Sequence, residues 1–132
     1  MNISATLISS FDKLVAKVQT NESEQNFNLP VKSTGLGSAI NGGELLLLSL
    51  ATCFCNDIYR EAGKKNINIK KVKVIVTGEF GGEGEPGYNF IYKTEIKADA
   101  TDDEINALIE YTDEVAEIHN TLRKGINIII IK

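Results

Sequence analysis

The chain has 132 residues, a length that fits one domain and can bury a core without disulfide or metal staples. Apolar residues make up 42% of it, which excludes a largely disordered protein. The net charge of -4 comes from 14 basic and 18 acidic residues and leaves no basic stripe, so no nucleic-acid partner is expected.

The first three strands are predicted by alternation. Ile3, Ala5 and Leu7 share one face, and Leu14, Ala16 and Val18 repeat the pattern after a turn at 9–12. A second turn at 21–24 leads to a third strand around Phe27 and Leu29. The segment 33–43 carries four glycines and is typical of a loop.

The first helix is predicted from about Gly43 to Ala62, with Gly63 as its stop signal. Its first half, 44–55, has no polar face, because Leu45–Leu48 already point to all sides at ~100° per residue. A helix of this kind must be covered on every side, and a small single sheet covers only one. We therefore expect a homodimer in which a second subunit supplies the missing cover.

The second half continues with a strand pair, a helix and a last strand. Val72, Val74 and Val76 alternate with polar residues, the loop 81–87 follows, and 88–97 forms the return strand. Thr101–Glu104 has the form of a capping box at the start of a helix that ends at His119. Gly125 opens a final strand, Ile126–Ile131. The order βββ-α-ββ-α-β indicates an α+β fold rather than a doubly wound sheet.

The location is predicted from the N-terminus, the apolar segments and the cysteines. Met1–Thr6 shows no basic segment followed by an apolar run, so no signal peptide is visible. The longest apolar block, Leu45–Leu50, is far too short to span a bilayer, and no membrane partner is expected. Cys53 and Cys55 stand too close for a disulfide framework. We interpret the compartment as cytoplasmic, where thiols stay reduced.

Cys53 is the first candidate for chemistry. A thiol attacks as thiolate and needs a lowered pKa or a neighbouring base. Cys53 lies about ten residues into the helix, beyond the reach of the helix dipole, and Asp57 one turn later opposes thiolate formation. Activation must come from outside this helix. The alternative is that Cys53 is a buried cysteine that acts as a small hydrophobic residue.

The other candidates have structural alternatives. Cys55 lies about 200° round the helix from Cys53, so a disulfide between them would require unwinding, and Cys55 is interpreted as a core or dimer contact. His119 is the only histidine and could act as a base for a cysteine brought near by folding, or simply cap its helix. With one His and no cysteine cluster, no metal is expected. Gly35 and Gly37 fall in a loop and form no dinucleotide fingerprint, and no cofactor is expected.

Two segments resemble the osmotically inducible protein C and organic hydroperoxide resistance (OsmC/Ohr) family. Glu44–Cys53 is similar to the family helix Pro-Glu-Glu-Leu-Leu-Leu-Ala-Ala-Leu-Ala-x-Cys, and Asp57–Arg60 looks like a branch with Asp one turn after that Cys. Ala116–Leu122 is similar to the family motif Cys-Pro-Val-His-x-Thr-Leu. The resemblance implies one OsmC-like domain over 1–132. It also implies an intertwined dimer in which antiparallel sheets wrap central helices.

The resemblance also implies a chemistry. Peroxidase members reduce organic hydroperoxides through a thiolate that becomes a sulfenic acid, which a second Cys resolves, with help from an N-terminal Arg and a Glu near the helix start. Here Cys53 matches the attacking Cys, but Ala116 takes the resolving position and Gly43 the place of the assisting Glu. No Arg precedes Arg60.

Two functions follow as hypotheses. The first is a one-cysteine thiol-dependent hydroperoxide reductase, in which Cys53 attacks the peroxide, His119 or Arg123 helps the thiolate form, and an external thiol completes the cycle. The second is a non-catalytic dimer that binds a small apolar ligand between its central helices. A structural role in an unknown protein contact is the third interpretation.

Overall fold

The computed structural model describes residues 1–132 as five strands and three helices. All strand pairs are antiparallel, which confirms the α+β class. The chain divides into two compact units, Met1–Leu45 and Leu46–Lys132. Whether 1–132 acts as one domain stays a prediction. None of the helices has both the length and the apolar character needed to cross a membrane.

The first unit is an antiparallel sheet of β1 (Ile3–Ser10), β2 (Lys13–Thr20) and β3 (Ser23–Phe27), in the order β1-β2-β3. Two-residue turns join the strands, and Asp12 and Asn21 take positive φ angles there. Asp and Asn tolerate this backbone region better than most residues. The turns lie within the predicted segments 9–12 and 21–24 but are shorter, and the third strand, predicted around Phe27 and Leu29, ends at Phe27.

The central helix α1 (Gly42–Lys64) is longer than predicted and includes Gly63. It begins with a reciprocal cap, in which the Asn41 side chain accepts from the amide of Glu44 at 2.9 Å and the Glu44 carboxylate accepts from that of Asn41 at 2.8 Å. Its buried residues form one stripe at helical spacing, which contains two carboxylates: Leu50, Phe54, Asp57, Ile58, Glu61 and Ala62. Leu48 remains 52% exposed, so the second unit does not cover all of the apolar helix surface.

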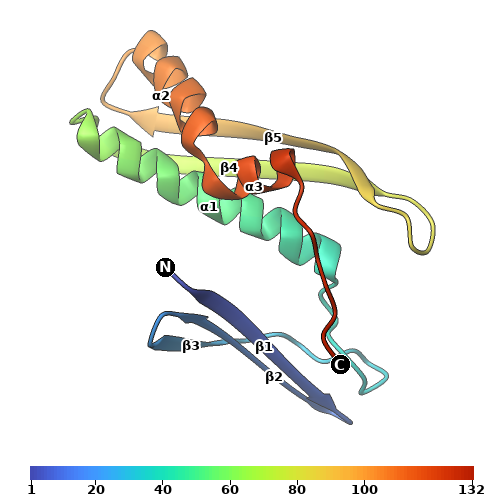
Figure 1. Ribbon diagram of the computed structural model, residues 1–132. Coiled ribbons are helices and arrows are strands. Elements are labelled where there is room, and N and C mark those ends of the chain that lie inside the picture. The colour runs from blue at the N-terminus through green and yellow to red at the C-terminus, as the bar shows by residue number, and fades with distance from the viewer. The chain divides into compact units, whose positions relative to one another are not determined.

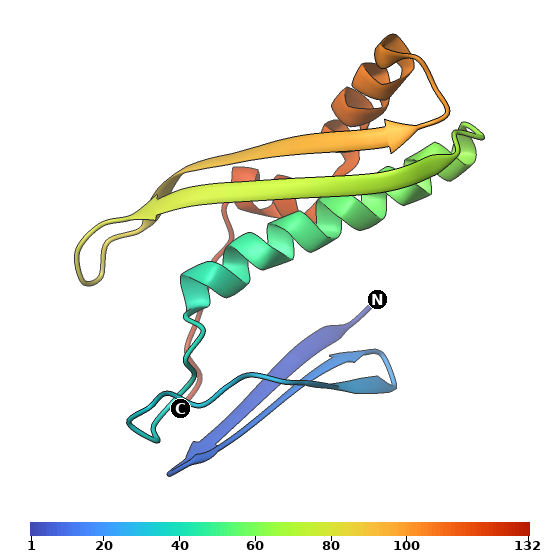
Figure 2. The ribbon, with the colours of Figure 1, turned by 180° about the vertical axis from the view of Figure 1, so that it is seen from behind.

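The core of the second unit lies between α1 and a long hairpin, β4 (Ile69–Phe80) and β5 (Gly87–Ala98). Figures 1 and 2 show α1 running along this hairpin. The fully buried cluster consists of Phe54, Ile58, Ala62, Leu108 and Ala116, and the sheet residues Val72, Val74, Tyr92 and Ile96 pack against it.

The predicted helix from Thr101 to His119 is two helices, α2 (Asp102–Val115) and α3 (Glu117–Lys124). Its capping box between Thr101 and Glu104 is confirmed. The end of this helix was wrongly predicted, because Ala116 is extended (φ -71°, ψ 107°) and its carbonyl starts α3 by accepting from the amide of Asn120. His119 therefore lies near the beginning of α3, not at the end of α2.

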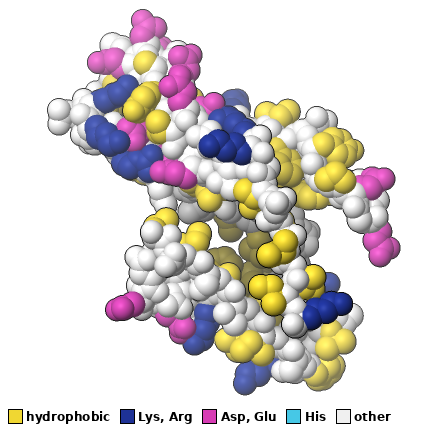
Figure 3. Space-filling model, in the orientation of Figure 1, with side chains coloured by type: hydrophobic (Ala, Val, Ile, Leu, Met, Phe, Trp, Pro, Cys, Tyr) yellow, Lys and Arg dark blue, Asp and Glu magenta, His cyan; other side chains and the backbone are white.

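The predicted last strand, Ile126–Ile131, is not formed. A strand needs a partner for its amide and carbonyl groups, and the segment finds none in the second unit, where β4 and β5 pair only with each other. Its side chains are among the most exposed apolar groups of the protein, with Ile128 at 90% and Ile131 at 87%. In Figure 3 hydrophobic side chains follow this segment on the visible face.

Candidate functional site

Cys53 sits where α1 meets the start of α3. Its thiol donates to Oδ2 of Asp57 at 3.4 Å, one turn further along α1. The other carboxylate oxygen, Oδ1, accepts from Nη1 of Arg60 at 2.6 Å, and the same Nη1 lies 3.5 Å from Oε1 of Glu117 on α3. Thiol, carboxylate and guanidinium thus form one hydrogen-bonded chain, which Glu117 joins from the neighbouring helix.

This surrounding keeps Cys53 protonated. Burial raises the pKa of the Cys53 thiol, and the hydrogen bond to Asp57 and the charges of Asp57 and Glu117 act in the same direction. The backbone amide of Ile118 opposes them and lowers this pKa. Ile118 belongs to the first turn of α3, whose amide groups lack partners within the helix and can therefore stabilise an anion. Asp57 thus opposes thiolate formation, as expected, and the one group that favours the thiolate, the Ile118 amide, lies outside α1.

The buried carboxylates of α1 are matched by cations at its edge. Burial raises the pKa of Asp57, which is 4% exposed, although Cys53 and Arg60 act to lower it. Hydrogen bonds from Lys64 and then Arg60, both at 2.8 Å, lower the pKa of Glu61. Of the two acids, Asp57 is therefore the one that can more readily take up a proton.

His119 and Arg123 lie together at a second place on α3. The His119 ring is only 5% exposed and packs against Phe54 and Tyr92, with ring centroids 5.4 and 4.7 Å apart. Arg123 binds Asp113 on α2 at 2.6 Å, and the hydroxyl of Tyr92 donates to the same carboxylate. The groups that surround the Cys53 thiol are Asp57, Glu117 and Ile118, so the structure does not bring His119 and Arg123 into this hydrogen-bonded chain.

The electrostatics of this second place follow from burial. Burial lowers the pKa of His119, and the charge of Arg123 lowers it further, which keeps the imidazole neutral near pH 7. Burial raises the pKa of Tyr92 to about 12, together with its bond to Asp113. Burial alone would raise the pKa of Asp113, but hydrogen bonds from Tyr92 and Arg123 outweigh it and lower the value.

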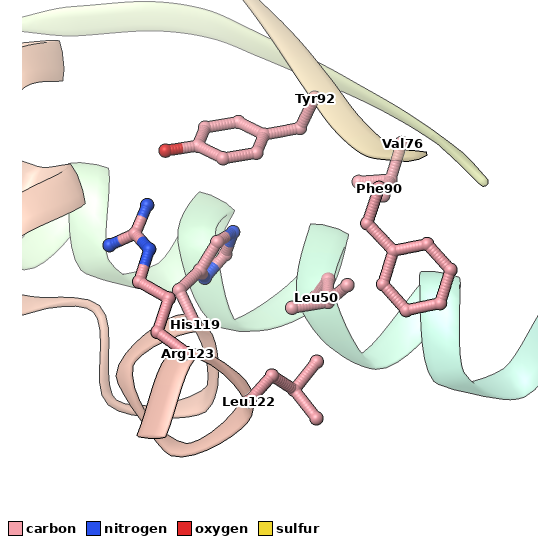
Figure 4. A pocket seen from close by; sticks show the side chains of 7 residues that line it. All are labelled: Leu50, Val76, Phe90, Tyr92, His119, Leu122 and Arg123. Atoms are coloured by element: carbon pink, nitrogen blue, oxygen red, sulfur yellow. The ribbon is translucent and has the colours of Figure 1, made fainter. Parts of the chain in front are cut away.

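A cavity of about 110 Å³ opens beside His119. Figure 4 shows its lining, with the His119 ring between Arg123 and Leu50 in this view and the Tyr92 ring above it. Four apolar side chains line the cavity, one each from α1, β4, β5 and α3: Leu50, Val76, Phe90 and Leu122. Three polar side chains complete the wall: Tyr92, His119 and Arg123.

Cys53, Asp57 and Glu117 are the residues whose donor atoms could share a metal ion, since these atoms lie within 4.8 Å of one another. Arg60 already supplies a positive charge to both carboxylates. A cation at this point would have to displace the guanidinium.

The ion pair of Arg60 with Asp57 was not found from the sequence, although the two residues stand three apart, a spacing that places them on one helix face. Glu117 lies within the second motif, but its place beside Cys53 depends on the break at Ala116. Tyr92 and Asp113 lie outside both motifs, and only the fold brings them together.

The fold and the cysteine site define an α+β protein with a thiol on its central helix. Residues 35–131 match the family described as OsmC-like protein, and the chain belongs to this family. No curated protein gives a significant match.

Solved structures support the fold. An OsmC-like protein from Mycoplasma pneumoniae is 21% identical, with a TM-score of 0.69 over 93% of this chain and 88% of that chain. The organic hydroperoxide resistance protein OhrB of Bacillus subtilis is 13% identical, with a TM-score of 0.57 over 95% and 93%. An organic hydroperoxide resistance protein OsmC from Legionella pneumophila is 19% identical, with a TM-score of 0.54 over 93% and 90%.

Proposed function

We propose that this protein reduces organic hydroperoxides with Cys53 as its single reactive thiol and an external thiol as reductant. The observation that carries the proposal is the hydrogen-bonded chain from the Cys53 thiol through Asp57 to Arg60, which faces the first turn of α3. Membership in a family with members named for hydroperoxide resistance supports it. A reducing compartment such as the cytoplasm would keep the thiol available.

In the first step the Cys53 sulfur attacks the distal oxygen of the hydroperoxide. An S–O bond forms, the O–O bond breaks, and the distal oxygen keeps its hydrogen, which gives a sulfenic acid. Asp57 accepts the thiol proton through the bond at 3.4 Å and passes it to the departing alkoxide, which leaves as an alcohol. Arg60 holds the carboxylate in place, and the Ile118 amide stabilises the sulfur anion as it develops.

In the second step an external thiol attacks the sulfenic sulfur, and water leaves as a mixed disulfide forms. A second external thiol then releases Cys53 and carries away the disulfide. The chain requires this route, because Ala116 occupies the family position of the resolving cysteine and Cys55 lies elsewhere on the helix. Both cysteines are free.

The experiment is a turnover assay with cumene hydroperoxide and dithiothreitol. We expect consumption of hydroperoxide that Cys53→Ser abolishes and that Cys55→Ser, the matched control on the same helix, retains. Equal consumption by the wild-type protein and Cys53→Ser, with both folded, would refute the proposal.

The active form in this proposal is a homodimer. Leu48 on α1 and the isoleucines of the C-terminal segment are exposed, and burial of such surface is the main driving force of association. A second copy can cover α1 and give Ile126–Ile131 the strand partner that one chain lacks. Light scattering should give the mass of two chains, and a folded monomer at all concentrations would contradict the dimer.

The second candidate function is ligand binding without catalysis. The raised pKa of Cys53 and the mostly apolar cavity favour it. Stabilisation against heat by an apolar compound, unchanged in Cys53→Ser, together with no hydroperoxide consumption, would select this function.

A further inference from the structure

The buried imidazole of His119 lacks a partner. Both of its ring nitrogens are buried, and neither forms a hydrogen bond within the protein. A buried polar group without a partner costs free energy, and each such group in a native structure needs an explanation. The aromatic contacts with Phe54 and Tyr92 fix the ring but do not satisfy its nitrogens.

The neighbouring polar groups are engaged with other partners. The hydroxyl of Tyr92 is directed to Asp113, and the Arg123 guanidinium also binds Asp113 and Asn120. The space that borders His119 is the cavity walled by Leu50, Val76, Phe90 and Leu122. A molecule in this cavity would be the nearest source of a hydrogen bond to the ring.

We propose that this cavity binds a small uncharged aliphatic alcohol, with its hydroxyl at His119 and its carbon chain against Leu50, Phe90 and Leu122. A neutral imidazole offers one donor and one acceptor, and a hydroxyl can pair with either. The cavity of about 110 Å³ has room for a short chain.

The charges at the cavity give an acid no clear advantage as the occupant. Arg123 is already paired with Asp113. Asp113 and Asp57 also act on the charge of His119, in the direction opposite to Arg123, so a carboxylate would meet charges of both signs. A purely apolar molecule would fill the space but would leave the imidazole without a partner.

The site does not depend on hydroperoxide reduction, because Cys53 is not part of its lining. Binding that persists in Cys53→Ser would therefore support the cavity whether or not the peroxidase proposal holds. Loss of turnover would in turn say nothing against the cavity.

The test is an NMR titration of the ¹⁵N-labelled full chain with three probes of equal chain length: 1-butanol, 1-chlorobutane and butyrate. We expect saturable shifts at the cavity residues and a dissociation constant for 1-butanol at least about fivefold lower than for the other two, the gain of one net hydrogen bond. His119→Phe, which keeps an aromatic ring against Phe54 and Tyr92, should remove this preference.

Leu122→Trp fills the cavity from its partly exposed wall. This variant should weaken the binding of all three probes while His119 stays in place. Equal affinity for 1-butanol and 1-chlorobutane in the wild-type protein would overturn the proposal, as would shifts outside the cavity or no saturable binding. The comparison of probes in the wild-type protein does not depend on whether either variant folds.

Discussion

Asp57→Asn should lower the pKa of the Cys53 thiol. The Asp57 carboxylate accepts a hydrogen bond from the Cys53 thiol at 3.4 Å. This hydrogen bond and the negative charge of Asp57 both favour the protonated thiol. At this separation a unit charge acts on a thiolate with about 1.2 kcal/mol even in the dielectric of water, and Cys53 is only half-buried. Removal of this repulsion lowers the pKa of the Cys53 thiol, and the thiolate fraction at neutral pH should therefore rise about eightfold.

The assay is the rate of alkylation by iodoacetamide against pH, in a Cys55→Ser background. The midpoint should move down in Asp57→Asn, while turnover of hydroperoxide should fall because the proton acceptor is lost. Asp102→Asn, an exposed acid at the start of α2, is the matched control and should leave the midpoint unchanged. A midpoint that stays or rises in Asp57→Asn would refute the reasoning about the site.

Three further predictions concern stability and assembly. Phe54→Ala removes a fully buried ring from the core and should lower the free energy of unfolding by about 3–5 kcal/mol in urea titrations. A loss below about 1 kcal/mol would contradict the burial of this ring. Folding lowers the pKa of His119, so the free energy of unfolding should be highest above the pKa of the unfolded state, about 6.5, and should decline as the pH falls below it. His119→Phe should reduce the slope of the free energy of unfolding against pH. An identical slope in both proteins would count against the buried neutral imidazole. In the proposed dimer, Ile128→Lys with Ile130→Lys places two charges on one side of the segment Ile126–Ile131 and should give the mass of a single chain in light scattering, whereas the mass of two chains would exclude this segment from the interface.

Much of the fold is predictable because its signals are local. Alternation found the strands, and the Thr101–Glu104 capping box marked the start of α2. The break at Ala116 was missed because this chain has Glu117 where the family motif has Pro, so the usual helix-breaking residue is absent. The final strand was predicted from its apolar residues, but a strand exists only where another strand pairs with it.

The candidate site was predictable only in part. The motif located Cys53, and the helical spacing showed that Asp57 would oppose its ionisation, which the geometry bears out. Glu117 and the Ile118 amide reach the thiol through the turn between α2 and α3, which a helix running through to His119 does not contain. The same error placed His119 at the end of α2 as a possible cap, whereas the structure buries its ring near the beginning of α3.

The most direct test of the proposed activity is the chemical state of Cys53 after one equivalent of organic hydroperoxide. Intact mass and trapping with a sulfenic acid reagent should show one added oxygen on the peptide that carries Cys53, reversed by dithiothreitol. An unmodified Cys53 in a folded, reduced protein at millimolar hydroperoxide would contradict the proposal.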